Sequence, residues 1–391
     1  MSLGSAVEAR LVRDPAEWAR LRDSWDGVVT GAERPSPFAT WDFLECSWLR
    51  FARPKGHALA VVALHEAGRL IGFAPFQLAT RRKLGLPLRR LSLLASWEAD
   101  RVPPLVHPPD RGAECAAAVI ACLEEHGRDW DQLSLREVSP EDPLGLALEA
   151  WSGRGGRRLV PEPASPSPYA LLEPGAEHGV KDLGSATRKS LRRYRRKLES
   201  AGPCGLEVFE TPEHMEHALA TYIDLEDRSW KRGEGQGVGK NESNHAFYTE
   251  LLPRLARDGR AVVSFLMQGG VAVAGAIDLR LGEAAYGSHA TYAESAAALS
   301  PGNVLNALLF EWHAAHGVRR YELYALFLGN KMRWASGTWE NRHLDVYQTR
   351  GLRRSLLFAP GRLKAMLAKP KPGASGPGAH DAGDPTEPDE R

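Results

Sequence analysis

The sequence contains few cysteines and no long apolar segment. Only four of its 391 residues are cysteines, and no two of them form a Cys-x-x-Cys pair. No pair of histidines has zinc-finger spacing, so we expect neither a disulfide framework nor a metal site. No apolar run approaches the ~20 residues that cross a bilayer, and the first residues lack the apolar core of a signal peptide. We therefore expect a cytoplasmic protein without a transmembrane segment.

The sequence also lacks an excess of charge of either sign. Fifty Lys and Arg residues stand against 49 Asp and Glu residues, which gives a net charge of +1. This balance excludes a protein whose whole surface coats a polyanion such as DNA, but it permits a local basic patch. Because 43% of the residues are hydrophobic, the chain can bury a core. Its length predicts two domains, at ~100–200 residues per domain.

Composition indicates where these domains begin and end. Four prolines occur in PEPASPSPY, residues 161–169, and exclude a helix there. We predict a first unit at 1–160, a Pro-rich linker at 161–180 and a second unit at 181–355. Residues 369–391 are rich in Pro, Gly and charge, which is typical of a disordered tail.

The two halves of the chain resemble each other. AVVALHEAGRLIGFAPF (60–76) and AVVSFLMQGGVAVAGAI (261–277) each read as a β-hairpin. EHGRDWDQLSL (125–135) and AHGVRRYELYAL (315–326) each read as a helix end followed by a strand. We infer an internal duplication. Each half is predicted to be an α/β unit with a mixed sheet of about five to seven strands flanked by helices.

The expected elements follow this duplication. In the first half, helices are expected at 15–27, 38–51 and 112–126, and strands at 58–65, 69–79, 88–95 and 131–137. In the second half, helices are expected at 185–200, 212–230, 244–257 and 303–316, and strands at 260–268, 271–281, 284–292, 319–325 and 343–349.

The sharpest charge feature is a basic helix at 187–200. Seven of the ten residues from Arg188 to Lys197 are Lys or Arg. Helical spacing places Leu191 and Leu198 on one face that can dock on the core. The remaining faces carry the arginines, including Arg192 and Arg193, and are expected to meet solvent. Like charges on one short helix repel each other, so a phosphate-bearing ligand, RNA or an acidic envelope surface is the alternative partner.

A second feature is the start of the helix expected near residue 303. Ser300 suits the N-cap, Pro301 suits the first helical position, and Gly302 leaves the backbone open. The free N–H groups of Gly302 and Asn303 and the positive helix end can bind an anion. A well-made helix start with no ligand explains the same residues.

Further candidates occupy strands and loops of the second half. Lys331 follows a core strand, where an ammonium group can stabilise an oxyanion or bind phosphate; a loop lysine packed beside Trp334 is the alternative. Asp224 lies on a helix that ends at Trp230 and Lys231, before a loop with four glycines. That loop can close over a substrate, although it is not a P-loop.

The strand AAYGSHATYAE contributes the last candidates. Alternation places Tyr286, Ser288 and Tyr292 on one face and His289 on the other. A single histidine can be structural or can act as a base. No Gly-x-Ser-x-Gly motif anchors a hydrolase triad.

In this order, these segments resemble the GNAT acyltransferase superfamily. The resemblance covers about residues 12–350 and is greatest to the branch of Fem-type peptidoglycan aminoacyltransferases and acetyltransferase-like proteins of bacterial cellulose synthesis. It rests on the basic helix, Ser-Trp-Lys at 229–231, Val-Ala-Gly at 273–275, Ser-Pro-Gly at 300–302 and Lys-x-x-Trp at 331–334. It implies two tandem GNAT-like units, of which the first is degenerate and the second holds the site.

Two departures bear on the donor. The Gln/Arg-x-x-Gly-x-Gly/Ala loop typical of acetyl-CoA enzymes is replaced by AESAAALSPGN, and Asn330 stands where the family has Tyr or Phe before the lysine. Acyl-CoA therefore remains the expected co-substrate, without a permanently bound cofactor, and aminoacyl-tRNA remains an alternative donor.

The resemblance implies transfer of an acyl group to an amine or hydroxyl of a small molecule or cell-envelope precursor, in envelope or polysaccharide metabolism. Lys331 is the candidate oxyanion donor, and His289, Asp224 or water is the candidate base. The acceptor is expected near five side chains: Trp230, Lys231, Tyr286, Tyr292 and Trp334. The alternatives are an aminoacyl-tRNA-dependent transferase, a non-catalytic protein of an envelope-polysaccharide pathway, and an RNA-binding protein that uses the basic helix.

Overall fold

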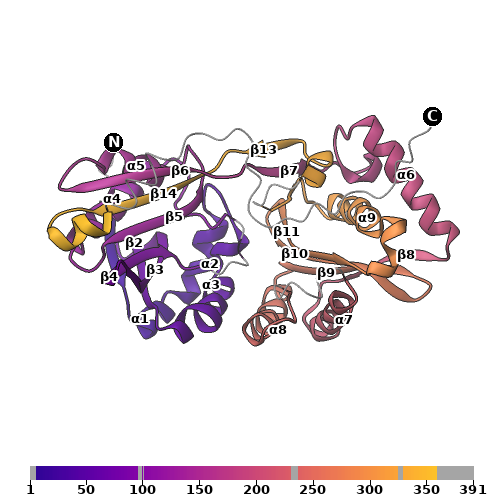
Figure 1. The fold of residues 1–391 in the computed structure, drawn as a ribbon, viewed down its shortest axis with the longest axis horizontal. Helices are drawn as coiled ribbons and strands as arrows, with labels where there is room; N and C mark the ends of the chain where they lie inside the picture. The colour runs from indigo at the N-terminus through magenta and orange to yellow at the C-terminus, as the bar shows by residue number, and fades with distance from the viewer. Residues whose placement is uncertain (1–5, 96–98, 100, 230–236, 325–328, 359–391) are drawn as a thin grey trace.

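The computed structural model describes residues 6–95, 99, 101–229, 237–324 and 329–358. Its strands form two seven-stranded sheets, which define two units side by side in Figure 1. Both sheets are mixed, because β4–β5 and β11–β12 pair in parallel and the other strand pairs are antiparallel. The prediction of two α/β units with mixed sheets flanked by helices is confirmed.

The first sheet has the order β1-β2-β3-β4-β5-β14-β6. Its strands are β1 (Glu8–Val12), β2 (Ala58–Glu66), β3 (Arg69–Lys83), β4 (Leu86–Leu93), β5 (Gln132–Val138), β6 (Arg157–Pro163) and β14 (Arg342–Gln348). The helices of this unit are α1 (Pro15–Ala19), α2 (Arg22–Thr30), α3 (Trp41–Ser47), α4 (Gly112–Glu125) and α5 (Pro143–Trp151).

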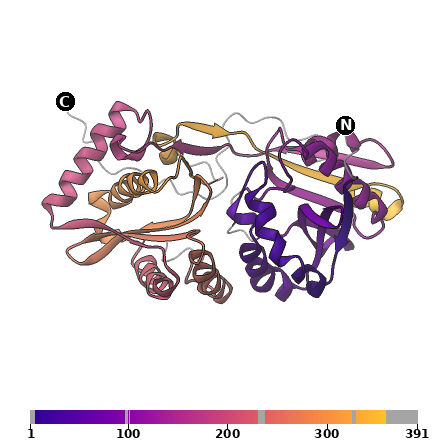
Figure 2. The same ribbon diagram turned by 180° about the vertical axis from the view of Figure 1, so that it is seen from behind.

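The second sheet has the order β13-β7-β12-β11-β10-β9-β8. Its strands are β7 (Ser167–Leu171), β8 (Cys204–Phe209), β9 (Ala261–Gln268), β10 (Val271–Leu281), β11 (Ala284–Tyr292), β12 (Arg320–Glu322) and β13 (Gly337–Trp339). The helices are α6 (Ser185–Ser200), α7 (Met215–Asp227), α8 (Glu242–Ala256) and α9 (Pro301–Ala315). Figures 1 and 2 show α6 and α9 on one face of this sheet and α7 and α8 on the other. Burial from both sides explains why β9 and β10 are almost continuously apolar.

The units exchange strands, which corrects the expected boundaries. The segment 161–180 is not only a linker, because it contains β7, which pairs with β12 and β13 of the second sheet. The strand expected at 343–349 exists as β14, but it lies between β5 and β6 of the first sheet. The chain therefore crosses between the units twice, and residues 342–348 belong to the first sheet rather than to the second.

A shared apolar core joins the two units. Helix α3 packs against α8, and Phe43 meets Phe247 edge to face at 5.6 Å between ring centroids. Phe38 meets Tyr286 of β11 at 5.3 Å in the same way. Ion pairs flank these rings, such as Arg50 with Glu250 at 2.7 Å. Within the described residues, no helix is long and apolar enough to cross a membrane.

Candidate active site

The second sheet splits open between β11 and β12. The two strands pair only from Ala284–Arg320 to Tyr286–Glu322. Beyond that point β11 continues to Tyr292 while pairing with β10 alone among the described strands. The helix that follows, α9, begins beside the end of β11, where Tyr292 approaches Gly302.

A β-bulge lies at the point where the strands part. The β10–β11 register passes from Ile277–His289 to Asp278–Gly287, so Ser288 is an extra residue in β11. A bulge shifts the alternation of side chains by one position. This shift corrects the predicted faces. Tyr286 faces Phe38 and His289 faces Tyr248 of α8 at 5.3 Å between rings, on the α7–α8 side of the sheet.

Tyr292 points to the opposite side of the sheet. Its Cδ1 lies 3.6 Å from the position that a Cβ at Gly302 of α9 would take. Tyr286 and Tyr292 were predicted to share a face that excludes His289. Instead, Tyr286 shares a face with His289, and Tyr292 is on the α9 face. Strict alternation along AAYGSHATY misses the bulge, although a glycine inside a strand, here Gly287, often marks one.

A buried polar network closes the base of the split. The carboxylate of Asp278 on β10 accepts from the Tyr321 hydroxyl on β12 at 2.7 Å and lies 2.8 Å from Nε2 of His313 on α9. Burial, reinforced by the Asp278 charge, raises the pKa of Tyr321 well above its usual value. The Tyr321 hydroxyl would lie 2.6 Å from a Cβ at position 287, so glycine is required there. These contacts connect β10 and β12 to α9.

The N-terminus of α9 is open. Ser300 occupies the predicted N-cap position, but with φ 53° and ψ 49° its side chain makes no capping hydrogen bond. Its carbonyl accepts the N–H of Asn303 at 3.1 Å. A Cβ at Gly302 would meet only the Tyr292 ring within 4 Å, at an ordinary contact distance. Space, the positive helix end and the N–H of Gly302 thus coincide beside the end of β11.

The equivalent helix of the first unit, α4, is blocked at its N-terminus. A Cβ at Gly112 would lie 2.5 Å from Cγ of Pro143 and 2.9 Å from Cε1 of His107. The chain beyond β4 also returns to the sheet, where Val106 pairs with Phe73. Gly112 is the first residue of α4 and is covered, whereas Gly302 is the second residue of α9 and is accessible.

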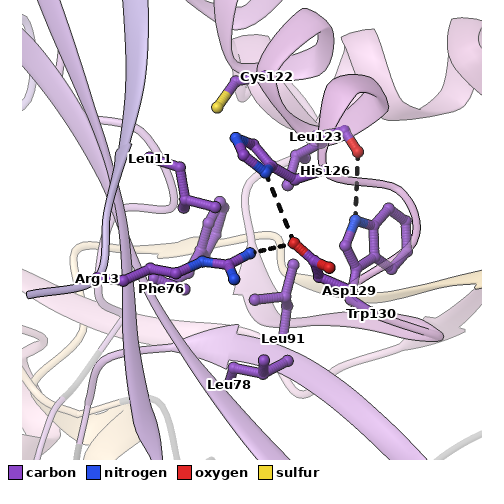
Figure 3. A pocket seen from close by; sticks show the side chains of 11 residues that line it. Leu11, Arg13, Phe76, Leu78, Leu91, Cys122, Leu123, His126, Asp129 and Trp130 are labelled. Atoms are coloured by element: carbon purple, nitrogen blue, oxygen red, sulfur yellow. Dashed lines mark hydrogen bonds and ion pairs between the residues drawn. The ribbon is translucent and has the colours of Figure 1, made fainter.

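The first unit has a pocket elsewhere, near the C-terminal end of α4 (Figure 3). Its lining is mainly apolar, with Leu123 and Trp130 among the side chains drawn. The charged groups at its rim pair with one another: Arg13 donates to Asp129 at 2.5 Å, and His126 lies 3.6 Å from the same carboxylate. The hydrogen bond from Arg13 lowers the pKa of Asp129. We find no arrangement for acyl transfer in this pocket.

The basic helix α6 packs along α9. Leu191 and Leu198 are buried, and Arg192 and Arg193 are exposed, as predicted. Arg192 pairs with Glu177 at 2.5 Å, and Arg193 lies over the Tyr194 ring at 5.3 Å. Lys197, which was not singled out, comes nearest to the start of α9, because its Nζ donates to the Ala298 carbonyl at 2.7 Å. The second half of α6 thus brings positive charge to the open helix end.

The α7–α8 side of the split holds polar groups that the sequence did not indicate. The hydroxyl oxygens of Tyr248 and Ser288 are 3.3 Å apart. Buried Glu226 of α7 accepts the N–H of Gly239 at 3.3 Å, and its other carboxylate oxygen has no hydrogen-bond partner within the described ranges. Buried Asn244 donates to the Gly237 carbonyl at 3.3 Å. In the sequence, Glu226 and Asn244 have no feature that distinguishes them from other polar helix residues, and only the fold brings them together.

The structure separates the other predicted site residues. Lys331 lies half-buried after β12, with Nζ 5.5 Å from the centre of the Tyr324 ring. Trp334 is 2% exposed and packs against Phe310 of α9, so it is a core residue and does not wall an acceptor site. The Asp224 side chain is 70% exposed and pairs with Arg228 at 2.8 Å. Trp230 and Lys231 lie outside the described residues.

Residues 185–336, the core of the second unit, match a family model described as an acetyltransferase (GNAT) domain. The second unit therefore matches a GNAT domain, which confirms the resemblance noted in the sequence. No curated protein matches the sequence.

Solved structures extend the likeness to both units. FemX has a TM-score of 0.59 and 11% identity, over 87% of this chain and 98% of its own. The C-terminal domain of a candidate lysylphosphatidylglycerol synthetase from Agrobacterium fabrum has a TM-score of 0.55 and 14% identity, over 89% of this chain and 95% of its own. L-PGS from Bacillus licheniformis has a TM-score of 0.52 and 13% identity, over 93% of this chain and 99% of its own. Identities this low show a shared fold and nothing more.

Proposed function

We propose that the protein is an acyltransferase that moves an acyl group from acyl-CoA to an amine or hydroxyl in the split of the second sheet. The observation that carries this proposal is the accessible start of α9, where Gly302 meets only the Tyr292 ring at the end of β11. At the start of α4, Pro143 and His107 cover Gly112. We propose one donor site per chain, in the unit that the GNAT family model matches, with a degenerate first unit.

The donor would use both sides of this opening. The pyrophosphate of CoA suits the N–H groups at the start of α9, with Ser300, Gly302 and Asn303 around it. Lys197 and the exposed arginines of α6 supply nearby positive charge. The pantetheine arm is extended, so it can lie along β11 beyond the last pairing of β11 with β12.

The acceptor would approach from the α7–α8 side. The acyl carbonyl lies between the strands in this arrangement, and the acceptor attacks it to form a tetrahedral oxyanion. His289 faces this side and is the proposed base. Lys331, beyond the end of β12, is the proposed oxyanion donor, a role worth about 3 kcal/mol. Asp224 is a poorer base because it is exposed and paired with Arg228.

The first unit would support the acceptor side from beneath. Phe38 packs against Tyr286, on the same face of β11 as His289. Because Phe38 is fully buried, it would hold this face in place without contacting the substrate. We propose a small-molecule or cell-envelope precursor as the acceptor and the cytoplasm as the location, in keeping with the Fem-type fold.

A second candidate function uses aminoacyl-tRNA as the donor. It is favoured by α6, which places a run of exposed cations beside the start of α9. A polynucleotide binds such a surface with a strong dependence on salt. The same acyl chemistry would then use an ester in place of a thioester.

Titration calorimetry with coenzyme A and with deacylated tRNA separates the two donors. If acyl-CoA is the donor, coenzyme A binds with one site per chain, and mixing acetyl-CoA with an amine panel releases free thiol. If tRNA is the donor, tRNA binds, coenzyme A does not, and Arg195→Glu with Arg196→Glu abolishes binding. Failure to bind either ligand, in a preparation with normal thermal unfolding, would contradict transferase function.

A further inference from the structure

Three exposed leucines gather at one end of the first unit. Leu84 is 68% exposed, Leu352 is 80% exposed and Leu356 is 47% exposed. Leu84 lies at the tip of the β3–β4 hairpin, and the other two lie one helical turn apart in a helix at 352–358. Large apolar side chains this exposed lose the free energy that burial would provide, so a cluster of them indicates a surface that another structure covers.

Contacts at this end hold the hairpin and the helix together. Arg353 donates to the Pro87 carbonyl at 2.6 Å. Lys83 lies over the Tyr347 ring at 5.1 Å, and Phe358 lies 5.5 Å from the same ring. Figure 1 shows the helix, in yellow, at the end of the first unit that points away from the second unit. The three leucines therefore belong to one surface, distant from the split sheet.

The hairpin tip is built against local preference. Leu84 has φ 53° and Gly85 has φ 77°. A two-residue turn of this kind favours Asn or Gly at its first position, and a bulky residue with positive φ is strained. Leucine at position 84 is unfavourable both for the turn and for contact with water. This indicates that its side chain contacts something other than the folded chain itself.

Positive charge surrounds the leucines. Arg81, Arg82 and Arg350 are exposed. Buried Asp131 adds no negative charge to this surface, because it pairs with Arg89, Arg353 and Arg354. The sequence from 346 to 380 contains no acidic residue, and it continues past the helix with Arg-Leu-Lys-Ala-Met-Leu-Ala-Lys at 362–369. Apolar and basic residues thus also alternate in the sequence that follows the helix.

We propose that Leu84, Leu352 and Leu356, with Arg81, Arg82 and Arg350, form a docking surface for an anionic lipid bilayer. The leucines would enter the boundary between headgroups and acyl chains, and the arginines would lie among the anionic headgroups. RNA would use the arginines but not the leucines, and a protein partner would not prefer anionic vesicles to neutral ones. The proposal does not depend on the proposed acyl transfer, since it concerns the other end of the molecule.

Vesicle flotation with the full chain tests this surface. Vesicles of phosphatidylcholine with about one third phosphatidylglycerol should bind the protein, and vesicles of phosphatidylcholine alone should not. Leu84→Asn with Leu352→Gln should lower the partition coefficient at least tenfold. Asparagine suits the turn, so this variant should fold. Leu146→Gln with Val271→Gln is the matched control, since those residues are 50% and 52% exposed outside the surface.

Charge substitutions complete the test. Arg81→Gln with Arg82→Gln should lower binding to anionic vesicles about 25-fold, at about fivefold for each basic side chain. Arg195→Gln with Arg196→Gln on α6 should leave it unchanged. Equal binding by the leucine variant and the wild type overturns the proposal. So does loss of binding in the α6 variant alone, or binding of RNA but not vesicles by the wild type.

Discussion

Substitution of Gly302 by valine tests the donor site at the residue on which it depends. The structure tolerates the change, because a Cβ there meets only Tyr292 at 3.6 Å, and the backbone of Gly302 is not left-handed. A valine side chain would, however, fill the space that a phosphate needs. Loss of one charge-assisted hydrogen bond costs about 1.5–3 kcal/mol, and displacement from the helix end costs about 0.3–1 kcal/mol more.

The expected result is a Kd for coenzyme A raised roughly 100-fold, which corresponds to about 3 kcal/mol. Titration calorimetry measures it, and thermal unfolding without ligand shows that the fold is intact. Gly27→Val is the matched control, because Gly27 also lies in a helix with nothing within 4 Å of its Cβ position. A Gly302→Val variant that binds coenzyme A as tightly as the wild type would refute a pyrophosphate site at α9.

Three further substitutions probe the mechanism and the framework. Lys331→Ala should lower kcat about 100-fold and change KM much less, because the oxyanion forms only beyond the ground state; unchanged turnover would remove Lys331 from the mechanism. Tyr321→Phe takes one of two hydrogen bonds from buried Asp278 and should lower the free energy of unfolding by about 1–3 kcal/mol in urea titrations; a change below about 0.5 kcal/mol would contradict this. Asp131→Asn should cost about 1.5–3 kcal/mol at neutral pH, because it weakens the hydrogen bonds that three half-buried arginines donate to this buried carboxylate. Burial tends to raise the pKa of Asp131, but arginine hydrogen bonds outweigh it and hold that pKa well below its usual range. The stabilisation is therefore full above about pH 4 and is lost as pH falls towards the folded-state pKa, so the variant's stability should vary less with pH over that acid range than the wild type's.

Local patterns predicted much of this fold. The hairpins β2–β3 and β9–β10 were expected from alternation and turn residues, and α6 and α9 from helical spacing and the Ser-Pro-Gly start. Each of these signals lies within about 20 residues of sequence. The predicted duplication also corresponds to the two sheets. Each sheet contains one parallel strand pair, which is β4–β5 in the first and β11–β12 in the second.

The features that define the candidate site were not predictable in this way. The bulge at Ser288 depends on how β10 pairs with β11, and the glycine in β11 does not by itself fix its position. The obstruction at Gly112 depends on His107 and Pro143 approaching it in three dimensions. Trp334 was predicted to line the site because it follows Lys331 closely, but burial against Phe310 determines its position. Sequence proximity is a poor guide to which side of a sheet a loop residue reaches.

The path of the chain makes the two units depend on each other. β7 follows β6 directly but belongs to the second sheet, where it pairs with β12 and β13. β14 follows β13 but lies between β5 and β6 of the first sheet. A fragment that ends with the second sheet would therefore lack β14, and the first sheet would lose the strand that joins β5 to β6. The first unit supports the candidate site through Phe38, which packs against Tyr286 of β11.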